Sequence, residues 1–521
     1  MHILLNRKLK EDTVVSNAEN DNLLENKTIT SLSTSLLENI KTIQNSLGNS
    51  NDIIIREFLV GKPLEIPIAI MYTDGLADNT SINDFVLESI ISNFEATSET
   101  TLQEIAIRLK AYCITVGSIK DIADLSSLLN AILSGETILL IDGLAIGIST
   151  STKRVKDRAI TEPVTEAVIR GPRESFTETL RTNTALIRRK IKSPNLWIKS
   201  RVIGEVTQTE IAVMYINGIA NEKIVKEVLH RLDEINIDGI LESGYIEQLI
   251  QDTKFTLFPT IYNSERPDVI AAELLEGKIA ILVDGTPFVL IVPALFTSFL
   301  QSAEDYYQSA FVSSFIRLIR FIGISLALVA PSLYISLTTF HQEMLPTSLL
   351  ISIYAQREGV PFPAFVEALI MEIAFEVLRE AGLRMPRMIG SAISIVGTLI
   401  IGQAAVEAGI VSAAMVIIVA LTAICSFLFP AYGLSNSIRI LRFPLMGLAA
   451  MFGLFGIFIG IMLLIIHLCS LRSFGVPYMS PYAPLIPKDQ KDALIVLPRG
   501  SLLTRPRLIS QINNVRGRKN R

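Results

Sequence analysis

The sequence predicts a chain of two kinds of structure: two tandem, similar α/β subdomains, then a polytopic helical membrane domain with about four spans plus re-entrant or interfacial helices. Three observations predict this. Of the 47 Lys and Arg and the 51 Asp and Glu residues, only 13 lie between Phe321 and Leu471. Two short patterns in the first half recur at nearly one offset. Four segments of the second half contain no charged residue.

Residues 1–51 are expected to form a flexible polar extension because they are rich in Asn, Ser and Glu. A short apolar periodicity around Leu32, Leu36, Leu37 and Ile40 would support one marginal helix. The first residues, MHILLNRKLKED, lack the apolar core of a secretory signal. We therefore expect the soluble half on the cytosolic side.

The first α/β subdomain is expected over residues 52–160. The apolar runs IPIAIMYTDG, from Ile66, and ILLIDGLAIGIST, from Ile138, contain Asp-Gly, which is typical of buried strands joined by hairpin turns. Helical periods lie between these runs, at 81–94 and 105–109. Strands that alternate with helices indicate an α/β unit.

This unit recurs further along the chain. MYTDGLAD at Met71 matches MYINGIAN at Met214, 143 residues later, and LSGETILLIDG at Leu133 matches LEGKIAILVDG at Leu275, 142 residues later. Two copies at so long a period indicate a duplication, with the second subdomain over 196–310, and not a solenoid. Residues 161–195 form the Arg-rich connection between the copies. Its arginines are expected to contact acidic partners or lipid phosphates, or alternatively to form a solvated helix face: Arg170, Arg173, Arg181, Arg188 and Arg189.

The membrane domain is predicted over residues 311–471. Its uncharged segments are 321–340, 388–406, 408–438 and 443–471. Each is long enough to cross a hydrocarbon core, which takes about 20 residues. The sequence therefore predicts four spans.

A segment between the first two spans does not fit this pattern. Residues 361–387 are amphipathic: one helix face carries Val366, Ile370, Ile373 and Val377, and the opposite face carries Glu372, Glu376, Arg379 and Glu380. We expect an interfacial or re-entrant helix. The candidates for gating, or for a vestibule that attracts cations, are Glu367, Glu372, Glu376 and Arg379, with plain interfacial charge as the alternative.

The tail, residues 472–521, carries ten Lys or Arg against two Asp. Such a cluster directly after an apolar span indicates the cytosolic side and attraction to lipid headgroups, and not a nucleic-acid arm. An even number of spans places the tail inside but leaves Arg439 and Arg442 outside. Because the tail carries more cations, we expect an even number.

The helix predicted from Met388 carries a stripe of small residues at spacings of three or four, which ends at Gly409. A stripe of this kind permits close helix packing. Alternatively, several copies of the helix surround a pore, which the small residues widen and the polar residues line. The pore-lining candidates are Ser391, Ser394, Thr398, Gly402, Gln403, Ala405 and Glu407.

Sequence motifs of catalysis are missing. The chain has no GxxxxGK[ST], HExxH or GxSxG pattern, and its four His and three Cys residues are scattered. We therefore expect neither an enzyme nor a metal or cofactor site.

Several long runs resemble a known family. They include RGPRESFTETLRTN at Arg170, LFPTIYNSERPD at Leu257 and REGVPFPAFVEALIMEIAFEVLREAGLRMPRMIG at Arg357. From about Asp52 to Tyr478 the chain resembles the A subunit of the spore germination nutrient receptors of the GerA family.

The resemblance implies a subunit in the inner membrane of the endospore. Its partners would be a transporter-like B subunit that binds the nutrient, a lipoprotein C subunit, further copies of itself in a ring, and membrane lipids. The ring would form a ligand-gated cation channel. The helix at 388–409 would line the pore, the α/β subdomains would form the cytosolic ring and coupling element, and 361–387 would be the element that moves.

Two other functions remain open at this point. The chain would be a scaffold that docks partners without conducting, or a secondary transporter. Broken helices favour a transporter, whereas the lack of inverted repeats among the spans argues against one.

Overall fold

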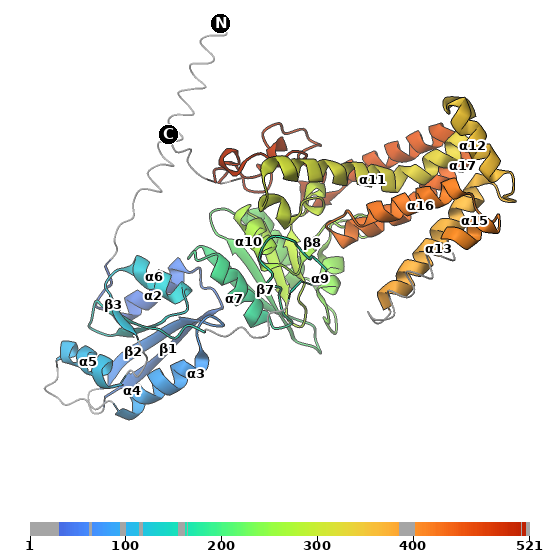
Figure 1. Cartoon of the computed structure of the whole chain (residues 1–521). Coiled ribbons are helices and arrows are strands. Elements are labelled where there is room, and N and C mark those ends of the chain that lie inside the picture. Colours follow the sequence, from blue (N-terminus) through green and yellow to red (C-terminus); the bar gives the residue numbers. More distant parts are fainter. Residues whose placement is uncertain are drawn as a thin grey trace, which may run out of the picture. The chain divides into compact units, whose positions relative to one another are not determined.

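The computed structural model describes residues 31–61, 65–93, 101–113, 118–154, 162–163, 165–384, 402–511 and 513–516. The chain divides into two compact units, and the second unit includes the long helices (Figure 1). The first unit comprises residues 1–158 and 184–199, and the second comprises 159–183 and 200–521.

The first sheet has the strand order β1-β2-β4-β5-β3, and each neighbouring pair is antiparallel. Its strands are β1 (Ile53–Val60), β2 (Ile66–Thr73), β3 (Ile119–Ile122), β4 (Thr137–Ile141) and β5 (Gly147–Thr150). The helices of this unit are α2 (Leu36–Ser46), α3 (Asn79–Ile82), η1 (Asn83–Leu87), α4 (Glu88–Asn93), α5 (Leu102–Arg108), η2 (Leu109–Cys113) and α6 (Leu125–Leu133).

Helices cover both faces of this sheet because its inner strands are apolar on both. Ala69 and Met71 of β2 pack in one cluster with α2 and α6, whereas Ile68 and Ile70 pack in another with the helices between β2 and β3. Successive side chains of a strand point to opposite faces, so a continuous apolar run serves two cores.

The helix α2 belongs to the first core, although the sequence predicted a flexible extension over residues 1–51. Leu36, Ile40 and Ile43 are buried against the sheet. The apolar periodicity of this segment did predict a marginal helix, and the structure differs in that the helix belongs to the core. One apolar face is enough to anchor a helix whose composition is polar.

The second sheet has the order β6-β7-β9-β10-β8, which is the order of the first sheet when strands are counted within each. Its strands are β6 (Leu196–Ile203), β7 (Thr209–Ile216), β8 (Tyr262–Ser264), β9 (Ile279–Val283) and β10 (Val289–Val292). The helices that accompany it are α7 (Leu180–Lys190), α8 (Glu222–Asp233), α9 (Ser243–Ile250) and α10 (Pro267–Leu275).

The two Asp-Gly sites form hairpin turns, as the sequence predicted. The glycine after each aspartate has a positive φ, 86° and 88°. Each aspartate also holds a helix N-terminus. Asp142 accepts a hydrogen bond from the backbone N–H of Leu36, and Asp284 accepts one from that of Leu180, both at 2.9 Å.

Arg188 of the connection is buried within the first unit. Its Nε and Nη2 donate to the two carboxylate oxygens of Asp52 at 2.8 and 3.0 Å. Both side chains are almost fully buried. Arg188 therefore contacts a carboxylate of its own chain, and the expectations that it contacts an acidic partner, lipid phosphates or solvent are wrong for this residue.

Two helices of the described chain are long and apolar enough to cross a membrane, α11 (Ala310–Thr339) and α17 (Tyr432–Ser470). α17 is not one straight helix, since Gly453 has φ 61° and ψ −141°. A Cβ on Gly456 would lie 2.1 Å from the carbonyl oxygen of Leu448, so residues 432–452 and 454–470 fold back on each other. The predicted span 443–471 is therefore a helical hairpin.

The other helices of this part are α12 (Thr347–Arg357), α13 (Ala364–Arg384), α15 (Ala405–Glu407) and α16 (Ala413–Ser426). The predicted span 408–438 breaks between α16 and α17, and residues 388–401 of the predicted span 388–406 lie outside the described residues. The four spans are thus not found as predicted. Counting uncharged residues does not detect a turn made of apolar residues.

The described part of the tail belongs to the second unit, packs against other parts of it, and is not a free basic appendage. It begins with the two-stranded pair β11 (Arg472–Ser473) and β12 (Val476–Pro477). The carbonyl of Tyr478, which is buried, accepts from the N–H of Phe296 at 2.9 Å. Arg505 donates through Nε to the carbonyl of Leu275 at 2.7 Å.

Replacing Asp52 by Ala should destabilise the first unit by about 3–5 kcal/mol, because the buried Arg188 would lose its carboxylate. Thermal or denaturant unfolding of the purified chain measures the loss. Glu57→Ala, at an exposed position of β1, is the matched control and should change stability by less than about 0.5 kcal/mol. Equal effects of the two substitutions would contradict the prediction.

Candidate functional site

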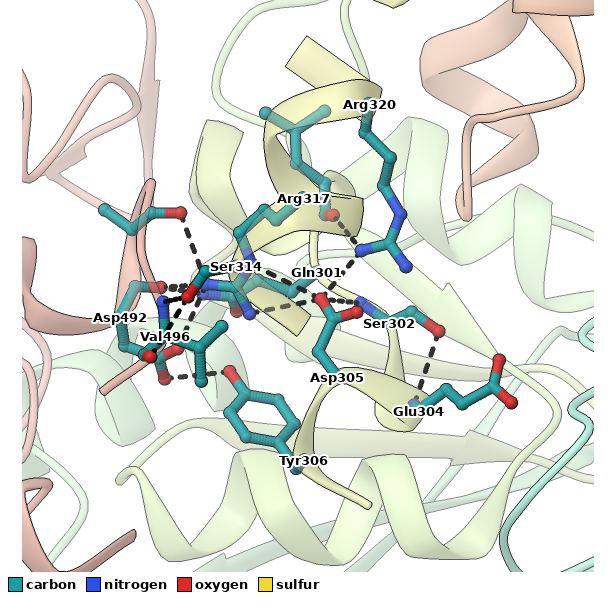
Figure 2. Close-up of polar contacts among 12 residues, drawn as sticks. Gln301, Ser302, Glu304, Asp305, Tyr306, Ser314, Arg317, Arg320, Asp492 and Val496 are labelled. Atoms are coloured by element: carbon teal, nitrogen blue, oxygen red, sulfur yellow. Dashed lines mark hydrogen bonds and ion pairs between the residues drawn. The ribbon is translucent and has the colours of Figure 1, made fainter. Parts of the chain in front are cut away.

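The chain passes from the second sheet into α11 through a largely buried set of charged and hydrogen-bonding side chains, here called the junction network: Asp305, Tyr306, Arg317, Arg320 and Asp492. Figure 2 shows these side chains converging from the turn before α11, from α11 itself and from the tail. Oδ2 of Asp305 accepts from Arg320 Nη1 at 2.7 Å and from Arg317 Nη2 at 3.1 Å. Arg317 Nη1 also donates to Asp492, at 3.1 Å to Oδ1 and 2.6 Å to the backbone carbonyl.

Local sequence explains how these groups meet. Ser302 and Asp305 form a capping box around the short 3-10 helix η4 (Ala303–Tyr306), which fixes the direction of the Asp305 side chain. Arg317 and Arg320 are three residues apart on α11, so they share one helix face. Arg317 is 0% exposed.

Burial dominates the electrostatics of the network. Burial raises the pKa of Asp492, while the Arg317 charge acts in the opposite direction. Burial also raises the pKa of Tyr306, which donates to Asp492 Oδ2 at 2.8 Å, and the Asp492 carboxylate raises it further. The tyrosine therefore stays neutral and acts as a hydrogen-bond donor.

The connection 165–172 is tied to the same region. Glu304 accepts from the backbone N–H groups of Ile169 and Arg170, both at 3.1 Å. Arg266 donates to the carbonyls of Glu166 and Pro172 at 3.1 and 3.0 Å. These hydrogen bonds join the connection to the residue that precedes α10 and to the turn that precedes α11.

Glu166 is the most strongly perturbed carboxyl in this connection. Burial raises its pKa to about 7, although a hydrogen bond from Ser264 Oγ at 2.6 Å acts in the opposite direction. The neighbouring Glu265 carboxylate raises the pKa further. Glu166 is thus the group here that changes charge near neutral pH.

The acidic candidates of α13 point into the helical core. Glu367 and Glu372 are both fully buried. Glu372 accepts from Arg442 Nη1 at 2.5 Å and from Thr422 Oγ1 at 3.3 Å. Glu367 accepts from the N–H of Ser412 at 2.6 Å, which is the residue before α16 begins.

Glu376 and Arg379 continue this inward face. Glu376 forms an ion pair with Arg439, with Arg439 Nε at 2.9 Å from Oε1. The guanidinium of Arg379 lies 5.6 Å from the ring centre of Phe427 and 6.0 Å from that of Tyr432. The structure therefore pairs the predicted vestibule glutamates 372 and 376 with two arginines of α17.

The apolar face of α13 is the exposed one. Ile370, Ile373 and Val377 are all exposed, Val377 to 63%. An interfacial helix that lies on a membrane would instead turn its charged face to water. The structure therefore does not fit the expected interfacial helix, because α13 directs its charged side chains toward the protein and its apolar side chains outward.

The pore-lining candidates are only partly described. Ser391, Ser394 and Thr398 lie outside the described residues. A Cβ on Gly402 would meet no atom within 4 Å. Gln403 and Glu407 are both exposed and are joined by a hydrogen bond of 3.0 Å, with Ala405 between them.

The sequence did not reveal the junction network. The turns at 265–268 and 304–307 are recognisable only as polar turns, and Asp492 only as one of two acids in a basic tail. The one local signal is the pair Arg317 and Arg320, two cations on one face at the start of an apolar helix. No group of three or more His, Cys, Asp or Glu residues suited to a metal occurs in the described ranges.

Comparison with known proteins places these features in context. The family described as "Bacillus/Clostridium GerA spore germination protein" matches residues 41–508. Spore germination protein KA of Bacillus subtilis (strain 168) is 50% identical over 485 residues, which cover 93% of this chain and 88% of that protein. Spore germination protein GerLA of Bacillus cereus is 40% identical and covers 90% and 95%.

A solved structure is also similar. The N-terminal domain of the A subunit of the Bacillus megaterium spore germinant receptor GerK3 is 43% identical in sequence, with a TM-score of 0.42. The match covers 52% of this chain and 99% of that domain.

Asp305→Ala should cost about 3–5 kcal/mol of stability, because two buried guanidinium groups would lose their shared carboxylate. The melting temperature of the purified chain in detergent measures the loss. Glu234→Ala removes an exposed carboxylate from the same unit and should leave the melting temperature nearly unchanged. A melting temperature unchanged by Asp305→Ala would contradict the role given to Asp305.

Glu166 should make the protein less stable as the pH rises. Its pKa is about 7 in the folded chain and 4.5 in an ordinary carboxyl. Between these values the folded state binds more protons than the unfolded state, so stability falls with rising pH, by about 3 kcal/mol in all. Melting curves from pH 5 to pH 8 test this. Glu166→Gln should show a shallower fall than the wild type, and identical slopes would refute the assignment.

Proposed function

The chain belongs to the Bacillus/Clostridium GerA spore germination protein family, and from this premise we propose that it is the A-type subunit of a nutrient receptor, forming a ligand-gated cation channel in the inner spore membrane. A role in spore germination follows from the family and from relatives named spore germination proteins. Membrane association follows from the family and from two long apolar helices.

The observation that carries the channel proposal is the exposed polar end of the predicted pore helix. Gln403 and Glu407 are uncovered by the described chain, and Gly402 has open space around its Cα. Polar side chains in a membrane domain turn toward protein or water and away from lipid. Further copies of this helix around a water-filled axis would satisfy both residues.

The partners proposed are a transporter-like B subunit that binds the germinant and a lipoprotein C subunit, with further copies of this chain in a ring. Germinant binding can open the channel only by its differential affinity for the open and closed states. The junction network supports a coupling role for the soluble part, because it fixes the first turns of α11 to the turn before it and to the tail.

We place the moving element at α13. Ion pairs from Glu372 and Glu376 hold α13 to Arg442 and Arg439 of α17. Buried ion pairs are costly to separate, so α13 would move together with the first leg of α17 or exchange its partners in one step. This supports two discrete arrangements and not a gradual one.

The same ion pairs bear on topology. Arg439 and Arg442 are neutralised inside the bundle, so they carry less weight in the positive-inside rule than the cations of the tail. We therefore keep the tail and the soluble half on the cytosolic side.

We also infer that the two sheets are copies of one duplicated subdomain. The equal strand order and the aspartates at the N-termini of α2 and α7 support this.

Thr398→Leu and Gly402→Leu should each change nutrient-dependent cation flux, because a large apolar side chain would narrow or dewet a pore at these positions. Flux is measured in liposomes that contain the purified receptor complex, with and without nutrient. Gly447→Leu is the control, because a Cβ at this membrane glycine also meets no atom within 4 Å.

The control should conduct as the wild type does. Unchanged flux in both pore variants, with the complex intact, would rule out the pore at this helix. Absence of flux from the wild-type complex would favour a scaffold that docks partners without conducting.

A further inference from the structure

A cavity of about 420 Å³ lies beside the junction network. Its walls come from α10, from the turn before α11 and from the tail, so it exists only because the tail folds onto the second unit. Its size falls within the range of small-ligand pockets. The function proposed above assigns no ligand to this cavity.

Four of the five acidic residues of the cavity already have cationic partners, and the fifth, Asp489, accepts a hydrogen bond from the backbone N–H of Arg507 at 3.0 Å. Glu273 pairs with Lys278 at 2.6 Å, and Glu276 pairs with Arg516. Asp268 and Asp492 are paired with Arg266 and Arg317 in the same way. Of the carboxylates that line the cavity, only that of Asp489 has no cationic partner within the described chain.

Four cations of the cavity form no ion pair within the described chain. One of them, Arg505, donates to backbone carbonyls and to the Asn513 side chain instead, which leaves three. Lys488, Lys491 and Arg499 line it, and none of them forms an ion pair with any residue in the described ranges. The guanidinium of Arg499 lies 5.2 Å from the ring centre of Tyr306, which holds it at the cavity wall. A surplus of cations at one rim is the electrostatic signature of an anion site.

Some buried polar atoms of the lining have no partner within the described chain. They are the acceptors Asp268 Oδ1 and Glu276 Oε2 and the donor Arg516 Nε. A buried polar atom without a partner costs free energy, so it indicates a missing one. The unpaired cations can contact an anion, and the two free acceptors can accept hydrogen bonds from hydroxyl groups. The site therefore suits an anion that also carries hydroxyl groups.

The cavity is placed at the start of a candidate membrane helix. Ser314 in the first turns of α11 exchanges hydrogen bonds with the backbone of Val496 in the tail segment between the cavity's cations. Around this contact Phe311, Phe315 and Ile495 are exposed, Phe315 to 64%. Exposed apolar side chains next to free cations are typical of a segment at the headgroup level of a membrane.

We propose that this cavity binds a phosphate group that carries hydroxyls, and that its source is the head group of an anionic phospholipid. Lys488, Lys491 and Arg499 would contact the phosphate, and the free oxygens of Asp268 and Glu276 would accept from the hydroxyls. The exposed apolar residues of α11 would contact the acyl chains. The proposal needs the chain in a membrane but not ion conduction, so it goes beyond the channel function.

The test is binding of short-chain phosphatidylglycerol to the purified full-length chain in neutral detergent, read by native mass spectrometry and by a thermal-shift titration. Lys488→Gln, Lys491→Gln and Arg499→Gln together should weaken binding on the order of 100-fold, at about tenfold or less per cation. The control replaces three exposed lysines elsewhere, Lys41, Lys223 and Lys226, by Gln and should bind as the wild type does.

A second variant separates the cavity from diffuse surface charge. Ala272→Trp places a bulky neutral side chain at an exposed position of α10 in the cavity wall. It should abolish phosphatidylglycerol binding while every cation remains. Wild-type affinity in this variant would overturn the cavity as the binding site.

Two further ligands distinguish a lipid head group from a soluble phosphate ester. Phosphatidylcholine of the same chain length should bind far more weakly, and equal binding would overturn the head-group proposal. Glycerol 3-phosphate supplies the phosphate and hydroxyls without acyl chains. If it binds as tightly as the lipid and displaces it, the source is a soluble phosphate ester and the lipid assignment is wrong. Flux is not measured here, so failure of this proposal and failure of the channel proposal are separate results.

Discussion

Arg317 is a guanidinium with no exposed surface at the start of a long apolar helix, and much of the second unit is arranged around it. A buried charge of this kind is tolerated only with excellent partners, because its desolvation costs several kcal/mol. Asp305 from the preceding turn and Asp492 from the tail provide them. The tail must therefore stay with α11 and the turn before it, although Asp492 is 175 residues from Arg317 in the sequence. A rotation of α11 would have to carry the turn and the tail with it, or break these buried ion pairs.

The same requirement orders the helical bundle. The charged face of α13 is turned inward, where Glu372 meets Arg442 and Glu376 meets Arg439, and Val377 is left outside. An outer surface of apolar residues suits lipid, and an inner ion pair removes the cost of unpaired charge. This arrangement also removes a conflict in the charge pattern, because arginines that are neutralised within a bundle do not mark the cytosolic side as free ones do.

Sequence reasoning succeeded where the signal is local. Apolar runs with Asp-Gly located the hairpins, since only a positive φ at Gly143 and Gly285 closes those turns. Sequence reasoning failed where two interacting residues are far apart in the sequence, and where the sequence does not tell whether water or lipid surrounds a helix. Arg188 and Asp52 are 136 residues apart, and Arg317 and Asp492 are 175 apart, so no local pattern joins them. The period of α13 divided its faces correctly, but a period does not tell which face is inside when lipid replaces water. The turn at Gly453 consists of apolar residues, so hydropathy alone merges its two legs.

The position of Asp492 in the sequence has a consequence for biosynthesis. Asp305 and Arg317 leave the ribosome early, but the second carboxylate for Arg317 is made 175 residues later, after both legs of α17. The hairpin returns the chain to the loop that precedes β8, where His467 lies 3.1 Å from Thr256. Asp492 can reach Arg317 only when both legs of this hairpin have formed. A chain whose tail does not reach this site keeps a buried cation with only one of its two carboxylate partners, and is less stable for that reason.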